Sequence, residues 1–220
     1  NQNDKLEVKN IWKACFGDSD SFIDYYFQEE FKADRVLLLK QEEIASMLTM
    51  IPVELSIPNN GKYNGSMLYA VATHPKYQGK GLSTKLMDYA KSYLQEQGVD
   101  IITLVPATLS LTNFYAKQGY LTGFYHREFT FTPSDLPKYS IPADTSITLS
   151  STSPLEYHRV RERLLSDYTY QSYQVDEIAY QKRLSLFFLC DIYLVSNHKD
   201  IIGCVILEKL DENQIYIKEL

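Results

Sequence analysis

The sequence has little of several residue types, and each scarcity argues against a class of protein. Its three cysteines, Cys15, Cys190 and Cys204, are scattered without the spacing of a zinc site or a disulfide framework. We therefore expect reduced thiols, no bound metal and a cytoplasmic protein. No apolar run approaches the roughly 20 residues that a membrane-spanning helix needs, so we expect no membrane partner. Lys and Arg number 22 against 28 Asp and Glu, a net charge of −6. Without a basic stripe, nucleic acid is not an expected partner either.

The remaining composition is that of an ordinary globular protein. Of the 220 residues, 45% are hydrophobic and 23% are charged, which suits one large or two small domains. The chain begins at Asn1 rather than Met and shows no signal-peptide pattern, so we expect a trimmed chain. The sequence leaves open whether the native chain continues past Leu220.

The first 60 residues predict two helices and a hairpin. Apolar residues at helical spacing indicate a helix that Gly17 ends, then a second helix capped by Asp18 or Ser19. Apolar runs at residues 36–39 and 44–53 predict two antiparallel strands.

A strand–turn–helix–strand unit follows. Residues 66–73 predict a strand and residues 101–105 a second one, parallel to it through a right-handed crossover. The helix between them has an apolar stripe that we expect to be buried and that Gly98 ends. The stripe consists of Leu82, Leu86, Tyr89, Ala90, Tyr93 and Leu94. Antiparallel strands leading into such a unit predict an α/β (α+β) fold with a mixed, mostly antiparallel sheet flanked by helices.

The later part of the chain predicts one or two strands in residues 120–132 and a Pro-rich linker at 133–144. Beyond it, strand and helix patterns partly repeat. We therefore divide the chain into residues 1–132, the linker, and a second segment at 145–220. The second segment predicts strands at 147–149, 192–195, 201–207 and 215–217, and helices around 155–168 and 176–184.

The turn that precedes the striped helix is suited to binding an anion. Glycines at 79 and 81 let the backbone turn sharply, and the N-terminus of the following helix adds unpaired N–H groups and a positive dipole end. By themselves these glycines favour an ordinary strand-to-helix turn. The turn reads Gln78-Gly79-Lys80-Gly81-Leu82-Ser83.

Residues 69–82, with this turn, resemble the acyl-CoA-binding motif of the GNAT N-acetyltransferase superfamily. That motif, Gln/Arg-x-x-Gly-x-Gly/Ala, corresponds here to Gln78-x-x-Gly81-x-Ser83, with Ser83 in place of a small apolar residue. The resemblance implies a GNAT fold followed by a partial second GNAT-like segment. It also implies acetyl-CoA as acyl donor and an amine of a small molecule or peptide as acceptor. By this resemblance the pyrophosphate contacts Gln78, Gly79, Lys80, Gly81, Leu82 and Ser83, and the pantetheine arm pairs with Val71, Ala72 and Thr73.

A second resemblance lies downstream, in residues 114–120. A tyrosine near a helix end, followed by a Gly-aromatic turn, is similar to the family's second signature and implies Tyr115 as general acid. A buried packing tyrosine is the competing interpretation. The asparagine often found seven residues before this tyrosine is Thr108 here.

The general base is not determined by the sequence. Glu54 and His74 are the nearest candidates by topology, and a water-relayed base would need neither. Both side chains also fit plain solvent-exposed roles.

Three functions remain in view. The first is an acetyl-CoA-dependent N-acetyltransferase. The second is a CoA-binding or regulatory module without turnover. The third, an aminoacyl-transferase, is disfavoured by the complete loop and the acidic charge. A phosphotransferase is excluded because Gly-x-x-x-x-Gly-Lys-Ser/Thr is absent. An unpaired strand edge near Ile215 would permit a homodimer.

Overall fold

The computed structural model describes residues 2–125, 129–135, 138, 146–198 and 200–219. The chain forms two compact units that interleave in sequence. The first comprises Asn1–Val105 and Leu165–Gln181, and the second comprises Pro106–Leu164 and Lys182–Leu220. The predicted linker at 133–144 lies largely outside the described residues, and the division of the sequence into domains stays a prediction.

The first unit is built on the mixed sheet that the sequence predicts. Its strands run in the order β1-β2-β3-β4, and an additional short strand, β6, pairs with β2. All pairs are antiparallel except β3 with β4, which is parallel. The strands are β1 (Val36–Lys40), β2 (Ile44–Ile57), β3 (Gly61–Thr73), β4 (Ile101–Leu104) and β6 (Tyr170–Ser172).

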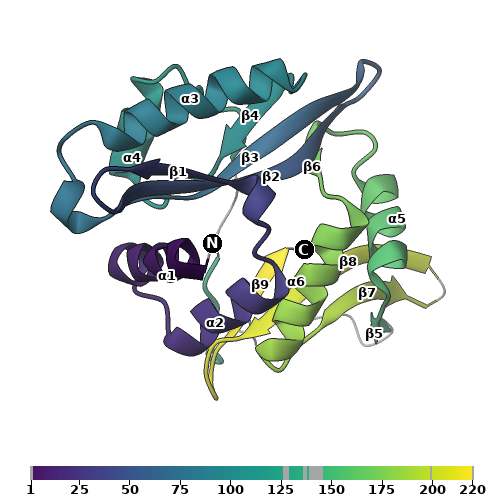
Figure 1. Cartoon of the computed structure of the whole chain (residues 1–220). Coiled ribbons are helices and arrows are strands. Elements are labelled where there is room, and N and C mark those ends of the chain that lie inside the picture. The colour runs from purple at the N-terminus through teal and green to yellow at the C-terminus, as the bar shows by residue number, and fades with distance from the viewer. Residues whose placement is uncertain (1, 126–128, 136–137, 139–145, 199, 220) are drawn as a thin grey trace. The chain divides into compact units, whose positions relative to one another are not determined.

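Helices cover both faces of this sheet. The predicted helices α1 (Gln2–Phe16) and α2 (Asp20–Glu29) pack on one face, here called the α1/α2 face, and α3 (Leu82–Glu96) lies on the other (Figure 1). Gly17 ends α1 with φ +71°, and the Ser19 hydroxyl accepts from Phe22 N at 3.2 Å as the N-cap of α2.

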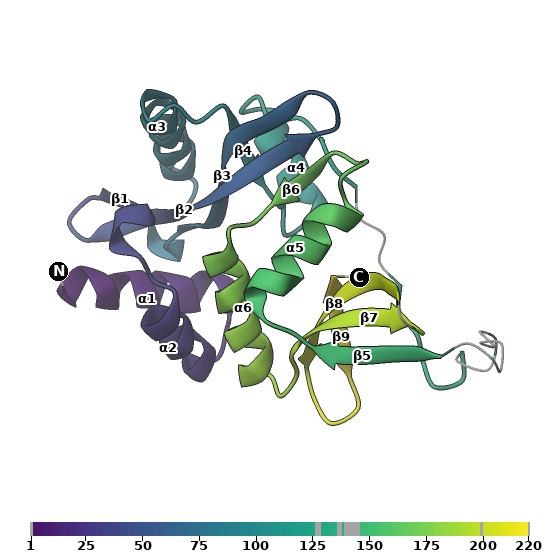
Figure 2. The same ribbon diagram turned by 90° about the vertical axis from the view of Figure 1, so that its right-hand side faces the viewer.

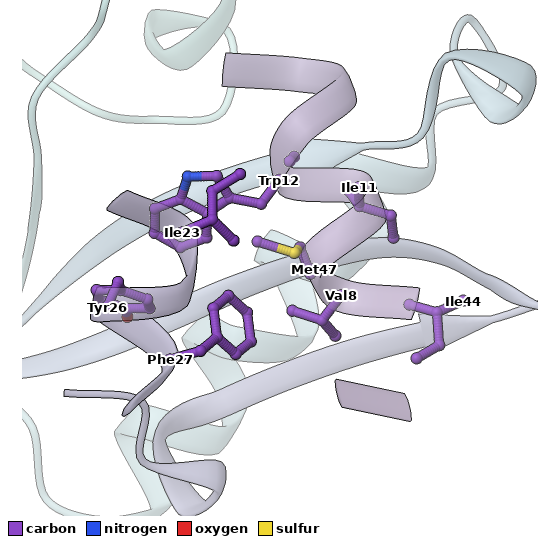
Figure 3. Close-up of a cluster of buried hydrophobic side chains, with 9 residues drawn as sticks. Val8, Ile11, Trp12, Ile23, Tyr26, Phe27, Ile44 and Met47 are labelled. Carbon is purple, nitrogen blue, oxygen red and sulfur yellow. The ribbon is translucent and has the colours of Figure 1, made fainter. Parts of the chain in front are cut away.

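The core on the α1/α2 face centres on the single tryptophan of the chain. Trp12 lies 4.6 Å from the Tyr26 ring and 5.8 Å from the Tyr69 ring, and its indole N–H donates to Asp18 at 2.7 Å. Figure 3 shows this side chain beside Ile23 and Met47, which come from α2 and β2. A buried aromatic side chain removes 150–250 Å² from water, about 4–6 kcal/mol at most.

Two sequence expectations are wrong. Tyr89 was expected in the buried stripe of α3, but it is 60% exposed and stacks on Tyr93 at 6.4 Å, while Met87 is fully buried instead. The described part of residues 120–132 contains no strand, although the residues are aromatic and β-branched. Leu121 is 93% exposed and Tyr125 90% exposed, so these side chains lack the packing against a neighbouring strand that gives β-propensity its effect.

Strand β6 was not expected from the sequence. It pairs with residues 54–56 of β2, on the edge of β2 that β1 occupies further along at residues 44–49. Figure 2 shows β6 running beside β2. Two strands distant in sequence thus share one edge of β2, and the second of them belongs to the segment predicted to form a separate domain.

The second unit contains an antiparallel sheet in the order β5-β7-β8-β9, with strands where the sequence predicts them. Tyr157 is fully buried, and Arg161 pairs with Glu219. β9 lies at an edge of this sheet and Ile215 is 64% exposed; a homodimer through this edge stays a prediction. The remaining elements are η1 (Ala33–Arg35), η2 (Pro75–Tyr77), α4 (Leu109–Ala116), β5 (Ile147–Ser151), α5 (Pro154–Leu164), α6 (Val175–Phe187), β7 (Ile192–Asn197), β8 (Asp200–Lys209) and β9 (Ile215–Glu219).

Candidate functional site

The turn between β3 and α3 has a backbone conformation that requires glycine. Gly79 and Gly81 have φ values of +75° and +69°, in the left-handed region that costs other residues about 1–2 kcal/mol. A Cβ built on either glycine would meet nothing within 4 Å. The positive φ, and not a lack of space for a side chain, therefore favours glycine at these two positions. The space next to both Cα atoms is open.

The start of α3 presents backbone N–H groups beside this turn. Gly81 is the N-cap of α3, and the first helical hydrogen bond runs from Lys85 N to Gly81 O at 3.1 Å. The N–H groups of residues 82–84 therefore precede the hydrogen-bond ladder. Residues 78–81 are exposed. Together with the positive end of the helix dipole, this arrangement fits an anion such as a pyrophosphate.

Buried and paired side chains fix the turn on the sheet. Tyr77 is 7% exposed and its hydroxyl donates to Glu43 at 3.1 Å. Lys76 also donates to Glu43, at 2.9 Å, and its hydrogen bond lowers the pKa of that carboxyl. The Gln78 amide donates to Thr73 O at 3.0 Å, which ties the first residue of the turn to the end of β3.

Strands β3 and β4 separate next to the turn. Their parallel pairing covers residues 65–68 and 101–104, whereas β3 continues to Thr73. Within the described residues no strand continues β4 beside the last part of β3. Ala70 has φ +50°, and the register with β2 shifts there, which marks a β-bulge. The bulge and the separation together leave one edge of β3 open.

The backbone direction shows which groups face that open edge. His74 N donates to Ala45 O at 2.9 Å, so His74 faces β2. Because neighbouring residues of a regular strand direct their N–H and C=O groups to opposite edges, Thr73 and the carbonyl of Val71, which precedes Ala72, face away from β2. The Thr73 carbonyl accepts from Gln78 and, at 3.3 Å, from the Cys15 thiol. The Val71 carbonyl and the Thr73 N–H thus both face the open edge of β3, and pairing of a pantetheine arm with residues 71–73 stays a prediction.

On the α1/α2 face, three tyrosines come together beside the bulge. Tyr26 lies 6.3 Å from both Tyr69 and Tyr180, measured between ring centroids. Burial raises the pKa of Tyr26 and of Tyr180, so both stay protonated. Tyr69 is 37% exposed. The sheet here therefore carries neutral phenols.

Buried carboxylates near these phenols are paired with cations. Arg35 lies 2.6 Å from Glu177 and 3.5 Å from Glu30, and Lys32 lies 3.5 Å from Glu30. Burial, followed by the charge of Glu177, raises the pKa of Glu30. Glu177 and Tyr180 come from α6, and sequence reasoning did not connect them with this sheet.

Gln171 of β6 also reaches this face. Its Oε1 accepts from the Thr103 hydroxyl at 2.8 Å, and its Nε2 donates to the Tyr173 hydroxyl at 2.9 Å and approaches Met67 Sδ at 3.7 Å. The sequence reasoning missed this residue as well. The alternation of Tyr and polar residues around position 171 was the available signal, because it is typical of a strand.

The proposed acid Tyr115 lies in the last turn of α4, in the second unit. It is 9% exposed, and burial raises the pKa of its phenol. Gly119, at φ +87°, lets Tyr120 N donate back to Tyr115 O at 3.2 Å, which is a Schellman-type helix end. This explains the Gly-aromatic pattern locally. The role of Tyr115 in catalysis stays a prediction.

The two candidate bases are each engaged with a neighbour. His74 Nδ1 accepts from Lys76 N at 3.2 Å, so this nitrogen is already occupied. Glu54 pairs with Lys62 at 2.5 Å. It lies opposite Asn64, four residues before Leu68, or about 13 Å along the strand from the point of separation. A water-relayed base therefore stays in consideration beside both.

The described residues contain no group of three or more His, Cys, Asp or Glu side chains placed to hold a metal ion. Within the same residues, no helix combines the length and apolarity needed to cross a membrane.

Comparison with known proteins gives concordant results. A family model described as acetyltransferase (GNAT) domain matches residues 1–123, and a search of curated protein sequences gives no match. A GCN5-related N-acetyltransferase from Anabaena variabilis has a TM-score of 0.74 and 18% identity, over 99% of this chain and 55% of that one. One from Kribbella flavida has a TM-score of 0.70 and 16% identity, over 100% and 55%. Eis1 from Mycobacterium abscessus has a TM-score of 0.67 and 12% identity, over 94% and 52%.

At these identities the structural likeness shows the fold alone. It confirms the predicted GNAT fold, with its mixed sheet flanked by helices. The chain spans about half the length of these structures.

Proposed function

Because this chain belongs to the GNAT acetyltransferase family, we propose that it transfers the acetyl group of acetyl-CoA to an amine of a small molecule or peptide. One observation carries the proposal. In a single compact unit, a glycine turn at a helix N-terminus directly follows a bulged strand with an open edge. The extended pantetheine arm and the doubly charged pyrophosphate of the acyl donor would thus each meet a matching backbone surface.

The residues fit acetyl-CoA by their donor chemistry. The N–H groups of the turn and of residues 82–84 would bind the pyrophosphate, because helix N-termini stabilise anions. The open edge of β3 at Val71 and Thr73 would pair with the amide groups of the pantetheine arm as an added strand does. A backbone N–H beside the bulge at Ala70 would polarise the thioester carbonyl.

Two proton transfers complete the reaction. The acceptor amine must lose a proton before or during attack, through Glu54, His74 or water. The departing thiolate must gain one, and we assign that step to the Tyr115 hydroxyl. Its raised pKa keeps the phenol protonated and able to donate. Tetrahedral collapse then breaks the C–S bond and releases the acetylated amine and CoA.

The test measures thiol release from acetyl-CoA with a panel of amines, for the wild type and Tyr115→Phe. Loss of one acid catalyst should lower turnover by about 10²–10⁴-fold and leave acetyl-CoA affinity unchanged. Tyr89→Phe is the matched control, since Tyr89 is exposed on α3. Undiminished turnover in Tyr115→Phe would reduce Tyr115 to a packing residue.

The alternative is a CoA-binding or regulatory module without turnover. Calorimetry separates the two, because a module would bind acetyl-CoA yet release no thiol with any amine of the panel. Absence of acetyl-CoA binding would refute both functions.

A further inference from the structure

Gln171 lies beside the point where β3 and β4 separate, although it comes from a distant part of the sequence. Its amide contacts Met67 and Thr103, which face each other in the β3–β4 pair. The next pair, Leu68 and Leu104, is the last before the strands part. The Gln171 amide therefore lies at the level at which the open edge of β3 begins, although the backbone of Gln171 pairs with Leu55, further back along the strands.

The amide lies on the α1/α2 face. Met67 precedes Tyr69 by two residues with no shift of register between them, so both side chains point to the same face of β3. Tyr69 contacts Trp12 and Tyr26 there. This places Gln171 on the face that carries the cluster of neutral phenols.

Reaching this position requires a curved sheet. The strand path runs β6-β2-β3-β4, so on a flat sheet three strand spacings, about 14 Å, would separate Gln171 from Thr103 across the strands, in addition to about 13 Å along them, because Gln171 pairs at the level of Tyr63 and Thr103 at the level of Met67. That exceeds the combined reach of a glutamine and a threonine side chain, yet their oxygens lie 2.8 Å apart. The α1/α2 face is therefore concave here. Gln171, Met67, Thr103 and Tyr173 are all partly exposed.

The chemistry of this surface is neutral and hydrogen-bonding. The carboxylates of Glu30 and Glu177 are already paired with Arg35 and Lys32. One Gln171 N–H approaches a thioether at 3.7 Å, and sulfur is a weak acceptor. A ligand oxygen in place of that contact would make a stronger hydrogen bond.

We propose that Gln171 selects the acceptor, and that the acceptor is an amine with a hydroxyl or carbonyl oxygen close to its amino group. This inference rests on the proposed function, because it places the acceptor on the α1/α2 face beside the thioester. The Gln171 amide donates to that oxygen while Thr103 and Tyr173 hold the amide in orientation. Selection is then by hydrogen bonding and not by charge.

The test uses two amines that differ by one hydroxyl, trans-2-aminocyclohexanol and cyclohexylamine. For the full chain, kcat/KM is measured with each amine, and the ratio of the two values is compared between wild type and Gln171→Leu. We expect the wild type to favour the amino alcohol and the variant to reduce that preference about fivefold, the worth of one neutral hydrogen bond. Affinity for acetyl-CoA should not change.

Two further variants exclude a merely structural effect. Gln171→Glu keeps an oxygen for Thr103 but removes the N–H donor, so it should also reduce the preference. Gln95→Leu, at an exposed position of α3, should leave the preference intact. A structural defect would lower both rates without changing their ratio.

Each outcome is decisive. A wild type that binds acetyl-CoA but does not prefer the amino alcohol overturns this inference and leaves the proposed function standing. An unchanged ratio in both Gln171 variants does the same. A wild type that neither binds acetyl-CoA nor releases thiol overturns both.

Discussion

Replacing Gly81 tests whether the turn before α3 binds the pyrophosphate. In Gly81→Ala the added Cβ meets nothing within 4 Å, but φ is +69°. The substitution therefore costs about 1–2 kcal/mol of backbone strain without a clash. For a chain of this size each kcal/mol lowers Tm by roughly 2–4 °C. The backbone can relieve the strain by leaving the left-handed region, which would turn the N–H groups away from the ligand.

Gly81→Glu adds a negative charge to the same strain. Two unit charges 4 Å apart in water interact with about 1 kcal/mol, so repulsion by a doubly charged pyrophosphate amounts to about 2 kcal/mol. This corresponds to a roughly 30-fold weaker acetyl-CoA affinity. Because salt screens exposed charges, the difference between the Glu and Ala variants should shrink as ionic strength rises from about 0.01 M to about 1 M. Isothermal calorimetry measures each Kd.

Gly98→Ala provides a matched control. Gly98 follows the other end of α3 at φ +75°, again with open space for a Cβ. It should lower Tm by a similar amount and leave the Kd for acetyl-CoA unchanged. If Gly81→Glu bound acetyl-CoA as tightly as Gly98→Ala, the phosphate-binding role of the turn would be wrong.

Three further predictions concern protons and stoichiometry. The raised pKa of Tyr115 keeps its phenol protonated above the ordinary tyrosine pKa of about 10. A profile of kcat against pH should therefore show no loss of activity from this group below about pH 10. A loss at lower pH that disappears in Tyr115→Phe would contradict the assignment. Because burial raises the folded-state pKa of Glu30, its contribution to stability is present below its unfolded pKa of about 4.3 and is lost as pH rises through the folded value. Urea unfolding should give Glu30→Gln a larger free energy of unfolding than the wild type at neutral pH, and an equal one at about pH 4. A smaller free energy of unfolding for the variant at neutral pH would refute this. Calorimetry should give one CoA per chain, since Gly203 is the only glycine after residue 145 and a second glycine turn is lacking; two would reveal a second site.

The helices and strands of residues 2–105 could be predicted because each has a local cause. Gly17 and Ser19 set helix ends through their own backbone and hydroxyl, and Gly79 and Gly81 permit the positive φ values of the turn before α3. The acyl-CoA motif was readable for the same reason, since it depends on consecutive residues between Gln78 and Ser83.

What could not be predicted depends on contacts between distant residues. Tyr89 and Tyr93 are equivalent in the helical pattern, but only packing decides that Met87 is buried and Tyr89 is not. The pairing of β6 with β2, and hence the position of Gln171, has no local signal that names its partner. Residues 120–132 show the converse. Their composition is typical of a strand, but those of them that the structure describes form no strand.

The shared edge of β2 has a consequence for folding during synthesis. β1 and β3 are made within a few residues of β2, whereas Gln171 follows its partner Leu55 by more than a hundred residues. At about 5–20 residues per second, a ribosome needs roughly 5–20 s to make that stretch. For that time residues 54–56 present an unpaired edge, the kind of surface that recruits strands of other chains. Translation speed between β3 and β6 should therefore influence how much of the protein reaches the native state.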